Sequence, residues 1–248
     1  MKEKVNDMKI LLICGHGDGD PGACALGYKE ADITREIAPK LKSILSHYAE
    51  VEVFDTSKNM YKYLKSGKTF DFKKYNYVVE LHLNACVNDT KGNGKTTGAE
   101  ILVHNLEKGI SVEEKILKNI EQLGFRNRGV KKRTDLLNMN TCKKKQGVSY
   151  ALIEVCFIDD LDDMKLYQAK KDEVVDAIAQ GIIDGFKLKN DVQSSVNLLI
   201  SANDITWELN HTYFPITDID RFKKELNEAK EKNSSLYWGF YKLVNKIK

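Results

Sequence analysis

Residues 151–158 read ALIEVCFI, an apolar run with the length of a buried strand that carries one carboxylate, Glu154, in its middle. A second apolar run, residues 77–83 (YVVELHL), carries a glutamate and a histidine, and a third, residues 10–14 (ILLIC), is followed by Gly-His-Gly with His16 at its centre. An ionised group inside a buried strand is costly unless it is paired or binds a metal. Three such strands therefore predict an α/β sheet with a metal site at one edge, which indicates an enzyme.

The composition is that of an ordinary globular protein. The chain has 248 residues, of which 42% are hydrophobic and 30% charged, and its net charge is +3. This length allows one medium domain with an appendage, and so small a net charge does not indicate nucleic acid. The five cysteines show no C-x-x-C spacing, which is typical of a protein made in a reducing cytosol. We expect no signal peptide and no membrane span, because no apolar run reaches about 20 residues.

Short apolar runs alternate with helical patterns over the first 187 residues. This alternation predicts a twisted, mostly parallel or mixed sheet flanked by helices. The expected strands are 9–14, 51–54, 77–83, 99–104 and 150–157, and the expected helices are 31–48, 111–123 and 171–186.

The pattern changes after residue 187. Residues 188–197 are polar and aperiodic, as in a linker, and residues 198–248 form a separate small unit that we expect to be helical. The helical spacing lies at 219–226 and 236–244, and the unit holds both tryptophans. Its aromatic residues either form a small core or provide a surface that binds sugars or cell wall.

A catalytic zinc site uses three protein ligands and leaves a fourth position for water. His16 and His82 are the first candidate ligands, because each lies at the carboxyl end of a strand, where α/β sheets bind ligands. Glu30, at the start of the first helix, is the candidate third ligand. Glu154 would then act as general base beside the metal.

Three neighbouring residues leave alternatives open. Glu80 lies two residues before His82 on the same face of its strand, so it either orients that histidine or competes for the metal. Cys14 and Cys86 are close to the histidines in sequence, and a site made of cysteines and histidines would leave Glu154 without a role.

An ordered set of motifs resembles the zinc-dependent N-acetylmuramoyl-L-alanine amidases, in particular those in endolysins of phages that infect Gram-positive bacteria. The resemblance covers residues 8–187 and implies that this segment is the catalytic domain. It implies Zn²⁺ bound by His16, Glu30 and His82, with Glu154 as the catalytic carboxylate. The matching motifs are Gly15-His16-Gly17, Pro21-Gly22-Ala23, Glu30, residues 80–85 (ELHLNA), residues 97–100 (TGAE), Arg128-Gly129-Val130 and residues 152–159 (LIEVCFID).

The resemblance also implies a substrate and a place of action. The bond cleaved would be the amide between N-acetylmuramic acid and L-alanine in peptidoglycan, with Asn84 as a substrate contact. The resemblance does not extend to residues 198–248, which match no known wall-binding module; they are a candidate cell-wall-binding domain, with anionic wall polymers as candidate partners. The protein would be made in the host cytoplasm without a signal peptide and would act on the wall after release. Many family members differ at Cys14 and Glu80, so the roles of these two residues are open.

Two other functions fit the same residues. A zinc peptidase or carboxypeptidase acting within the stem peptide would use the same ligands and the same glutamate on a different bond. A non-catalytic wall-binding protein could keep the fold, although retention of the ligands and Glu154 argues against it. Phage and host origins are both compatible with the sequence, which does not indicate an oligomeric state.

Overall fold

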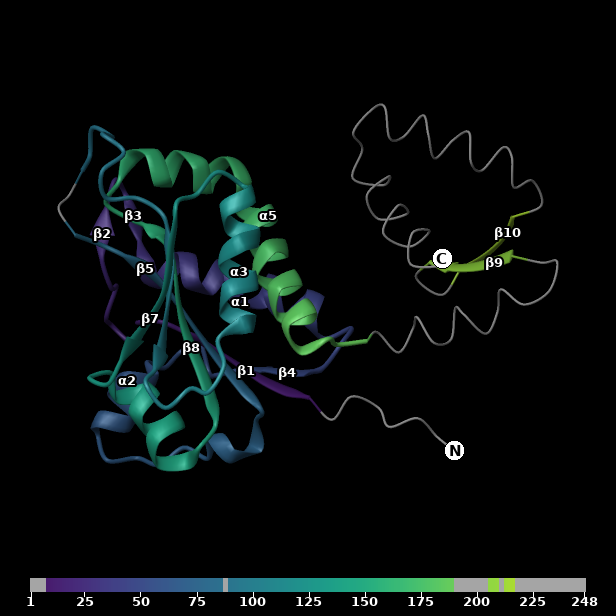
Figure 1. The fold of residues 1–248 in the computed structure, drawn as a ribbon, viewed down its shortest axis with the longest axis horizontal. Helices are drawn as coiled ribbons and strands as arrows, with labels where there is room; N and C mark the ends of the chain where they lie inside the picture. Colours follow the sequence, from purple (N-terminus) through teal and green to yellow (C-terminus); the bar gives the residue numbers. More distant parts are fainter. Residues whose placement is uncertain (1–7, 87–88, 190–204, 210–211, 217–248) are drawn as a thin grey trace. The chain divides into compact units, whose positions relative to one another are not determined.

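The computed structural model describes residues 8–86, 89–189, 205–209 and 212–216 (Figure 1). The chain forms two compact units, Met1–Lys189 and Asn190–Lys248.

The first unit is built on a six-stranded mixed sheet with the strand order β4-β1-β5-β8-β6-β7. The pairs β4·β1, β1·β5, β5·β8 and β6·β7 are parallel, whereas β6 runs antiparallel to β8. The predicted α/β class with a mixed sheet is therefore confirmed. The strands are β1 (Lys9–Cys14), β4 (Glu50–Val53), β5 (Tyr77–Asn84), β6 (Ala99–His104), β7 (Asn127–Arg133) and β8 (Ser149–Phe157).

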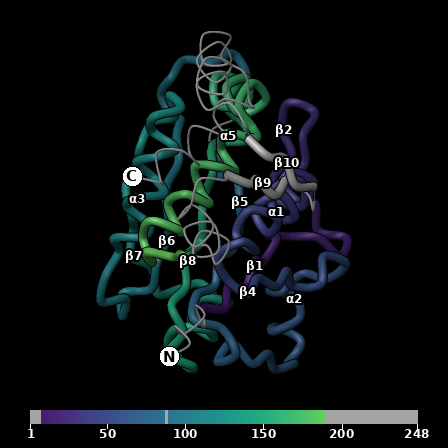
Figure 2. The backbone as a smooth tube through the Cα atoms, turned by 90° about the vertical axis from the view of Figure 1, so that its right-hand side faces the viewer, coloured from purple at the N-terminus to yellow at the C-terminus, as the bar shows by residue number. Residues whose placement is uncertain are grey.

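Three long helices cover one face of this sheet. They are α1 (Glu30–Leu45), α3 (Ser111–Gln122) and α5 (Leu161–Phe186), and Figure 2 shows them in front of the strands. Their apolar stripes pack on the side chains of alternate strand residues to form the larger core, which includes Ile37, Ile116 and Ile178. Burial of these stripes is the main force that fixes the helices to the sheet.

Short helices cover part of the opposite face. They are α2 (Met60–Lys65), the 3-10 turn η1 (Phe72–Lys74), α4 (Leu137–Met139) and the π-helical turn η2 (Asn140–Lys144), and Figure 1 shows α2 on the side of the sheet away from α3 and α5. Their apolar residues form the smaller core with Leu11, Val78 and Leu152. Glu80 and Glu154 share the face of Val78 and Leu152, because side chains alternate along a strand.

Strand β7 and helix α5 are the larger elements of the first unit that differ from the sequence prediction. Strand β7 was not predicted: its residues NRGVKKR are mostly exposed at the edge of the sheet, so they lack the apolar alternation of a buried strand. Helix α5 begins at Leu161, ten residues before the expected start at 171, and Asp160 caps it by accepting from the Asp163 N–H. A non-helical residue, Lys170, lies one residue before the predicted start, which explains why the regular spacing begins there.

The second unit contains two described strands, β9 (Ile205–Leu209) and β10 (Thr212–Ile216), which pair antiparallel. The spacing of apolar residues did not indicate this pair. The helical patterns at 219–226 and 236–244 and the predicted linker from 190 onward lie outside the described residues. No helix in the described part of the chain has the length and apolar character needed to cross a lipid bilayer.

Candidate metal centre

His16 lies in the loop that follows β1. The Gly15 N–H donates to Leu81 O at 2.9 Å, which ties the loop to β5. A Cβ at Gly15 would lie 2.5 Å from Cε1 of His82, so this position requires glycine. His16 itself has φ = +61°, a conformation that costs a residue with a Cβ free energy. The Arg35 guanidinium holds this turn through hydrogen bonds of 3.1 Å to Gly15 O and His16 O.

Glu30 is the first residue of α1, and its side chain is buried. It follows two short strands, β2 (Cys24–Ala25) and β3 (Tyr28–Lys29), which pair antiparallel and bring the start of the helix to β5. Its Oε2 accepts from the Ala23 N–H and its Oε1 from the Leu83 N–H, both at 3.0 Å. A carboxylate is also favoured at a helix N-terminus by the helix dipole.

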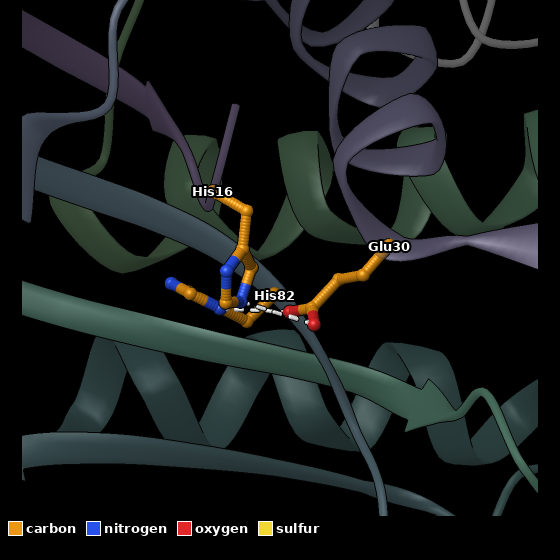
Figure 3. A group of neighbouring side chains, drawn as sticks. All are labelled: His16, Glu30 and His82. Atoms are coloured by element: carbon orange, nitrogen blue, oxygen red, sulfur yellow. Dashed lines mark hydrogen bonds and ion pairs between the residues drawn. The ribbon is translucent and has the colours of Figure 1, made fainter. Parts of the chain in front are cut away.

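The structure brings the three predicted ligands together (Figure 3). Glu30 Oε2 lies 3.1 Å from Nε2 of His16, and Glu30 Oε1 lies 2.8 Å from Nδ1 of His82. The two imidazole rings meet edge to face, with centroids 5.0 Å apart. One donor atom from each residue lies within 4.8 Å of the other two.

The second nitrogen of each imidazole also contacts a carboxylate. Asp20 Oδ2 lies 3.0 Å from Nδ1 of His16, and Glu80 Oε1 lies 2.9 Å from Nε2 of His82. Glu80 is buried and accepts further bonds from the Tyr150 hydroxyl and from the Asn138 amide. Glu80 therefore lies against the ring nitrogen of His82 that points away from Glu30.

Glu154 lies beside His82 on the neighbouring strand, since the two residues are register partners in β5 and β8. Its Oε2 is buried and has no hydrogen-bond partner among the described residues. Burial raises the pKa of Glu154 to about 7, against an opposing effect of His82. The carboxyl can therefore hold or release a proton near neutral pH.

Asn84, two residues after His82 on β5, and Glu100, on β6, contact each other across β8, the strand that carries Glu154. The Asn84 amide donates to Glu100 Oε1 at 3.1 Å, and its Oδ1 accepts from the Ala85 N–H at 2.9 Å. Glu100 is the direct cross-strand partner of Glu154 and also contacts Arg128 and Lys131. The hydrogen bonds with Glu100 and Ala85 thus fix the orientation of the Asn84 amide.

The cysteines do not join this group. Cys14 is buried and its thiol donates to Thr34 O at 3.6 Å, and Cys86 is exposed. Among the described residues, the cluster with metal-ligand spacing consists of His16, Glu30 and His82.

The chemistry of this donor set fits a divalent metal ion. Two imidazole nitrogens and one carboxylate oxygen are typical of catalytic zinc sites with an open fourth position. Burial would lower the pKa of His82, but hydrogen bonds to Glu30 and Glu80 raise it well above its ordinary value. Burial would likewise raise the pKa of Glu30, but hydrogen bonds from His16 and His82 hold it well below its ordinary value. A cation bound between these groups would replace the proton that they share.

Sequence reasoning missed several residues that surround the site. Asp20, Asn138 and Tyr150 contact the ligand pair or Glu80, and Arg35 fixes the His16 loop. Asp20 follows His16 by four residues in a glycine-rich loop, and this spacing could have indicated it. Asn138 and Tyr150 have no such local signal, because they reach Glu80 across separations of 58 and 70 residues.

Comparison with known proteins identifies the family of this site. The family model described as N-acetylmuramoyl-L-alanine amidase matches residues 10–184. The chain belongs to this amidase family. All three residues of the candidate metal centre and Glu154 lie within the matched segment.

Two relatives share this amidase segment. The chain is 30% identical over 176 residues to the "Probable autolysin PH" of Staphylococcus aureus (strain NCTC 8325 / PS 47), an alignment that covers 64% of this chain and 35% of the relative. It is also 30% identical over 183 residues to the "Endolysin" of Bacillus phage SPP1, covering 71% of this chain and 64% of the relative. The chain thus spans about a third of the first protein and less than two thirds of the second.

Solved structures share the fold of the first unit. The catalytic domain of the CD27L endolysin targeting Clostridia difficile is 23% identical with a TM-score of 0.56, covering 71% of this chain and 97% of that domain. An N-acetylmuramoyl-L-alanine amidase from Clostridium difficile 630 is 21% identical with a TM-score of 0.57, covering 73% and 98%. These similarities establish the amidase fold.

Proposed function

We propose that this protein is a zinc-dependent amidase that hydrolyses the bond between N-acetylmuramic acid and L-alanine in peptidoglycan, and so lyses the bacterial cell wall. The observation that carries the proposal is the convergence of His16, Glu30 and His82 beside Glu154, whose Oε2 has no hydrogen-bond partner in the described part of the chain. Membership of the amidase family supports the choice of bond.

His16, Glu30 and His82 would hold Zn²⁺ through the atoms that now face one another. The ion, when bound, supplies a Lewis acid for the scissile carbonyl and lowers the pKa of water. Asp20 and Glu80 would accept the N–H of the two outward ring nitrogens, which leaves the inward nitrogens as lone-pair donors.

Glu154 would carry the proton through the reaction. Its carboxylate takes a proton from the attacking water and gives it to the leaving nitrogen of L-alanine. A pKa of about 7 suits both tasks at neutral pH, because the group both accepts and donates at little cost. The register pairing of His82 with Glu154 supports this assignment, since adjacent strands lie about 4.8 Å apart.

Product analysis on purified peptidoglycan tests the proposal. We would compare the wild type, the chelator-treated wild type and Glu154→Gln, which keeps the size of the side chain. New L-alanine amino termini without new reducing sugar ends are expected from the wild type alone. The variant should lose at least about a hundredfold in rate, as expected for a general acid–base catalyst, while its zinc content stays at that of the wild type.

The matched control is Glu173→Gln, an exposed position on α5 far along the chain from the site. It should keep full activity. New amino termini from another stem residue would move the protein to the peptidase class. No metal-dependent release of any amino terminus would leave a non-catalytic wall-binding protein.

The second unit and the place of action complete the proposal. Residues 198–248 would bind the cell wall, with anionic wall polymers as partners, and residues 188–197 would link them to the catalytic unit. The protein would be synthesised in the host cytoplasm and would reach the wall after release. The presence of an endolysin among the relatives supports this order of events.

A further inference from the structure

The inference concerns the substrate beyond the scissile bond and rests on the proposed amidase function. The leaving nitrogen must lie close to Glu154, because this carboxyl returns the proton to it. The peptide arm therefore leaves the site on the Glu154 side of the histidines. The next strands on that side are β6 and β7.

A cluster of charges lies on that path. Glu100, the cross-strand partner of Glu154, accepts from Arg128 Nε at 2.7 Å and from Lys131 Nζ. Two cations thus share the carboxylate of Glu100, so the group of these three side chains carries a net charge of +1. The Lys131 side chain is 43% exposed, so its ammonium is accessible to a ligand.

The backbone of β7 places the side chains of both Arg128 and Lys131 against Glu100. The pairing of β6 with β7 contains a register shift between Ala99 and Ile101, opposite residues 128–129. Gly129, with φ = +80°, takes the conformation that such a bulge requires. The Arg128 guanidinium also lies over the Phe157 ring, with 4.8 Å from Cζ to the centroid, which fixes its position. Bulges of this kind redirect side chains next to active sites.

A cavity that both histidines line, on the face of the sheet covered by α2 and α4, has a different character. This cavity has a volume of about 320 Å³ and is also lined by Asp20, Glu80 and Asp135 together with apolar residues such as Met60 and Leu136. Carboxylates there would repel an anionic group. An uncharged acyl arm fits this cavity, whereas an anionic peptide arm fits the β6–β7 side.

We infer that Lys131 and Arg128 bind a carboxylate of the substrate's peptide arm, on the residue that follows L-alanine. Two residues of extended peptide span about 7 Å. Strands β6 and β7 lie about 5 and 10 Å from β8 at ordinary strand spacing. The first free carboxylate beyond the scissile bond therefore reaches the level of β6, where the side chains of both cations contact Glu100. Lys131 and Arg128 are specificity-determining residues in this assignment, and Glu100 holds them in place.

The test compares two soluble muramoyl-peptide substrates that differ at one group. One has a free carboxylate on the residue after L-alanine, and the other has a carboxamide there. For the zinc-loaded full chain we expect kcat/KM to favour the carboxylate by about tenfold, as for a charge-assisted hydrogen bond. In Lys131→Met the preference should fall to about twofold or less.

Two variants serve as controls. Lys131→Arg keeps the charge and should keep most of the preference. Lys132→Met removes a charge from the next residue, which is the register partner of Val103 and so lies on the other face of β7, and it should leave the preference unchanged. A melting curve of each variant would show that it is folded.

The outcomes separate the inference from the proposed function. Equal rates on both substrates in the wild type, or an unchanged preference in Lys131→Met, would overturn the carboxylate site while leaving the amidase intact. Absence of amide cleavage on both substrates would overturn the proposed function itself. The wild-type ratio alone decides the matter if Lys131→Met does not fold.

Discussion

Glu80 Oε1 lies 2.9 Å from Nε2 of His82, while the other ring nitrogen, Nδ1, faces Glu30 at 2.8 Å. The two carboxylates therefore fix the imidazole from opposite sides. When Nε2–H donates to Glu80, the lone pair of Nδ1 is directed at the position where a metal ion would lie. Glu80 is itself held by Tyr150 and Asn138, so the orientation of His82 depends on residues that are distant in sequence.

This relationship predicts that Glu80 sets the zinc affinity. Glu80→Gln keeps the shape but brings an amide N–H₂ group against the Asn138 and Tyr150 donors. We expect zinc binding to weaken by about ten- to a hundredfold, the usual effect of losing a residue that orients a metal-bound histidine. Competition with a fluorescent zinc chelator measures the affinity without reference to activity.

Tyr150→Phe provides a graded version of the same test. It removes one donor to Glu80 and should weaken zinc binding by less than Glu80→Gln does. The matched control is Tyr75→Phe, because Tyr75 also donates to a carboxylate, Glu52, at 2.5 Å but lies on the β4 side of the sheet. Equal zinc affinities for Tyr150→Phe, Glu80→Gln and the wild type would contradict the role of Glu80.

Gly22 has no room for a side chain beside the ligands. A Cβ there would lie 2.6 Å from Cδ2 of His16 and 2.7 Å from Oε2 of Glu30. Gly22→Ala should therefore displace two of the three ligands and reduce zinc affinity by more than tenfold, a change that calorimetric titration would measure. The chain should still fold, because the two cores do not include this loop position.

Gly19→Ala separates this collision from backbone strain. Gly19 also has a positive φ, +78°, but a Cβ there meets no atom of the described residues within 4 Å. The strain of a left-handed conformation costs about 1 kcal/mol in either variant. Equal losses of zinc affinity in the two variants would show that strain in the loop, and not the collision, is responsible.

The sequence indicated the parts of the site that interrupt an apolar pattern. Glu154, Glu80 and His82 stand out because their strand neighbours are apolar, and His16 stands out because it follows a strand directly. Glu30 had a weaker signal, since an acidic residue at a helix start has an ordinary explanation in the helix dipole. The strands with buried faces were predicted for the same reason, because burial enforces periodicity.

The parts of the site that the sequence did not indicate lie in polar stretches of the sequence. Strand β7 is exposed at the sheet edge, so the sequence pattern did not place Arg128 and Lys131 beside Glu100. Their proximity to the site arises from the antiparallel pairing of β6 with β8, which no local pattern specifies. Asn138 and Arg35 likewise act on residues that tertiary structure brings to them.

Asp163 predicts a pH dependence of stability in the first unit. It is buried and accepts from the Gly98 and Phe157 N–H groups, and burial raises its pKa from 3.8 to about 6. A raised pKa means that the folded state binds the proton more tightly than the unfolded state. The resulting stabilisation is present in full below pH 3.8 and is lost as the pH rises through about 6.

Asp163→Asn should therefore be more stable than the wild type at pH 8 and close to it below pH 3.8. The variant keeps an oxygen that accepts from both N–H groups but carries no charge at any pH. The difference in unfolding free energy at pH 8 has an upper limit of about 3 kcal/mol. Thermal unfolding of both proteins across this pH range measures the difference in stability. Loss of metal in acid affects both proteins equally, because both have the same metal site, so it does not contribute to the difference. The control is Asp162→Asn, because Asp162 is exposed on the same turn. A difference in stability between Asp163→Asn and the wild type that grows toward acid pH would refute the raised pKa of Asp163.

Arg35 joins the metal site to the fold through its planar guanidinium. Its nitrogens donate to Gly15 O and His16 O at 3.1 Å and to Thr56 O at 3.0 Å, and a lysine ammonium does not match this fork. Arg35→Lys should leave at least one carbonyl without a partner, at a cost of about 1–3 kcal/mol. The melting temperature should fall by several degrees, and zinc affinity should fall with it because the backbone of His16 is no longer held.

Arg133→Lys is the matched control, since that arginine forms an exposed pair with Asp135 on the surface. If the two variants melt together and bind zinc equally well, Arg35 does not position His16.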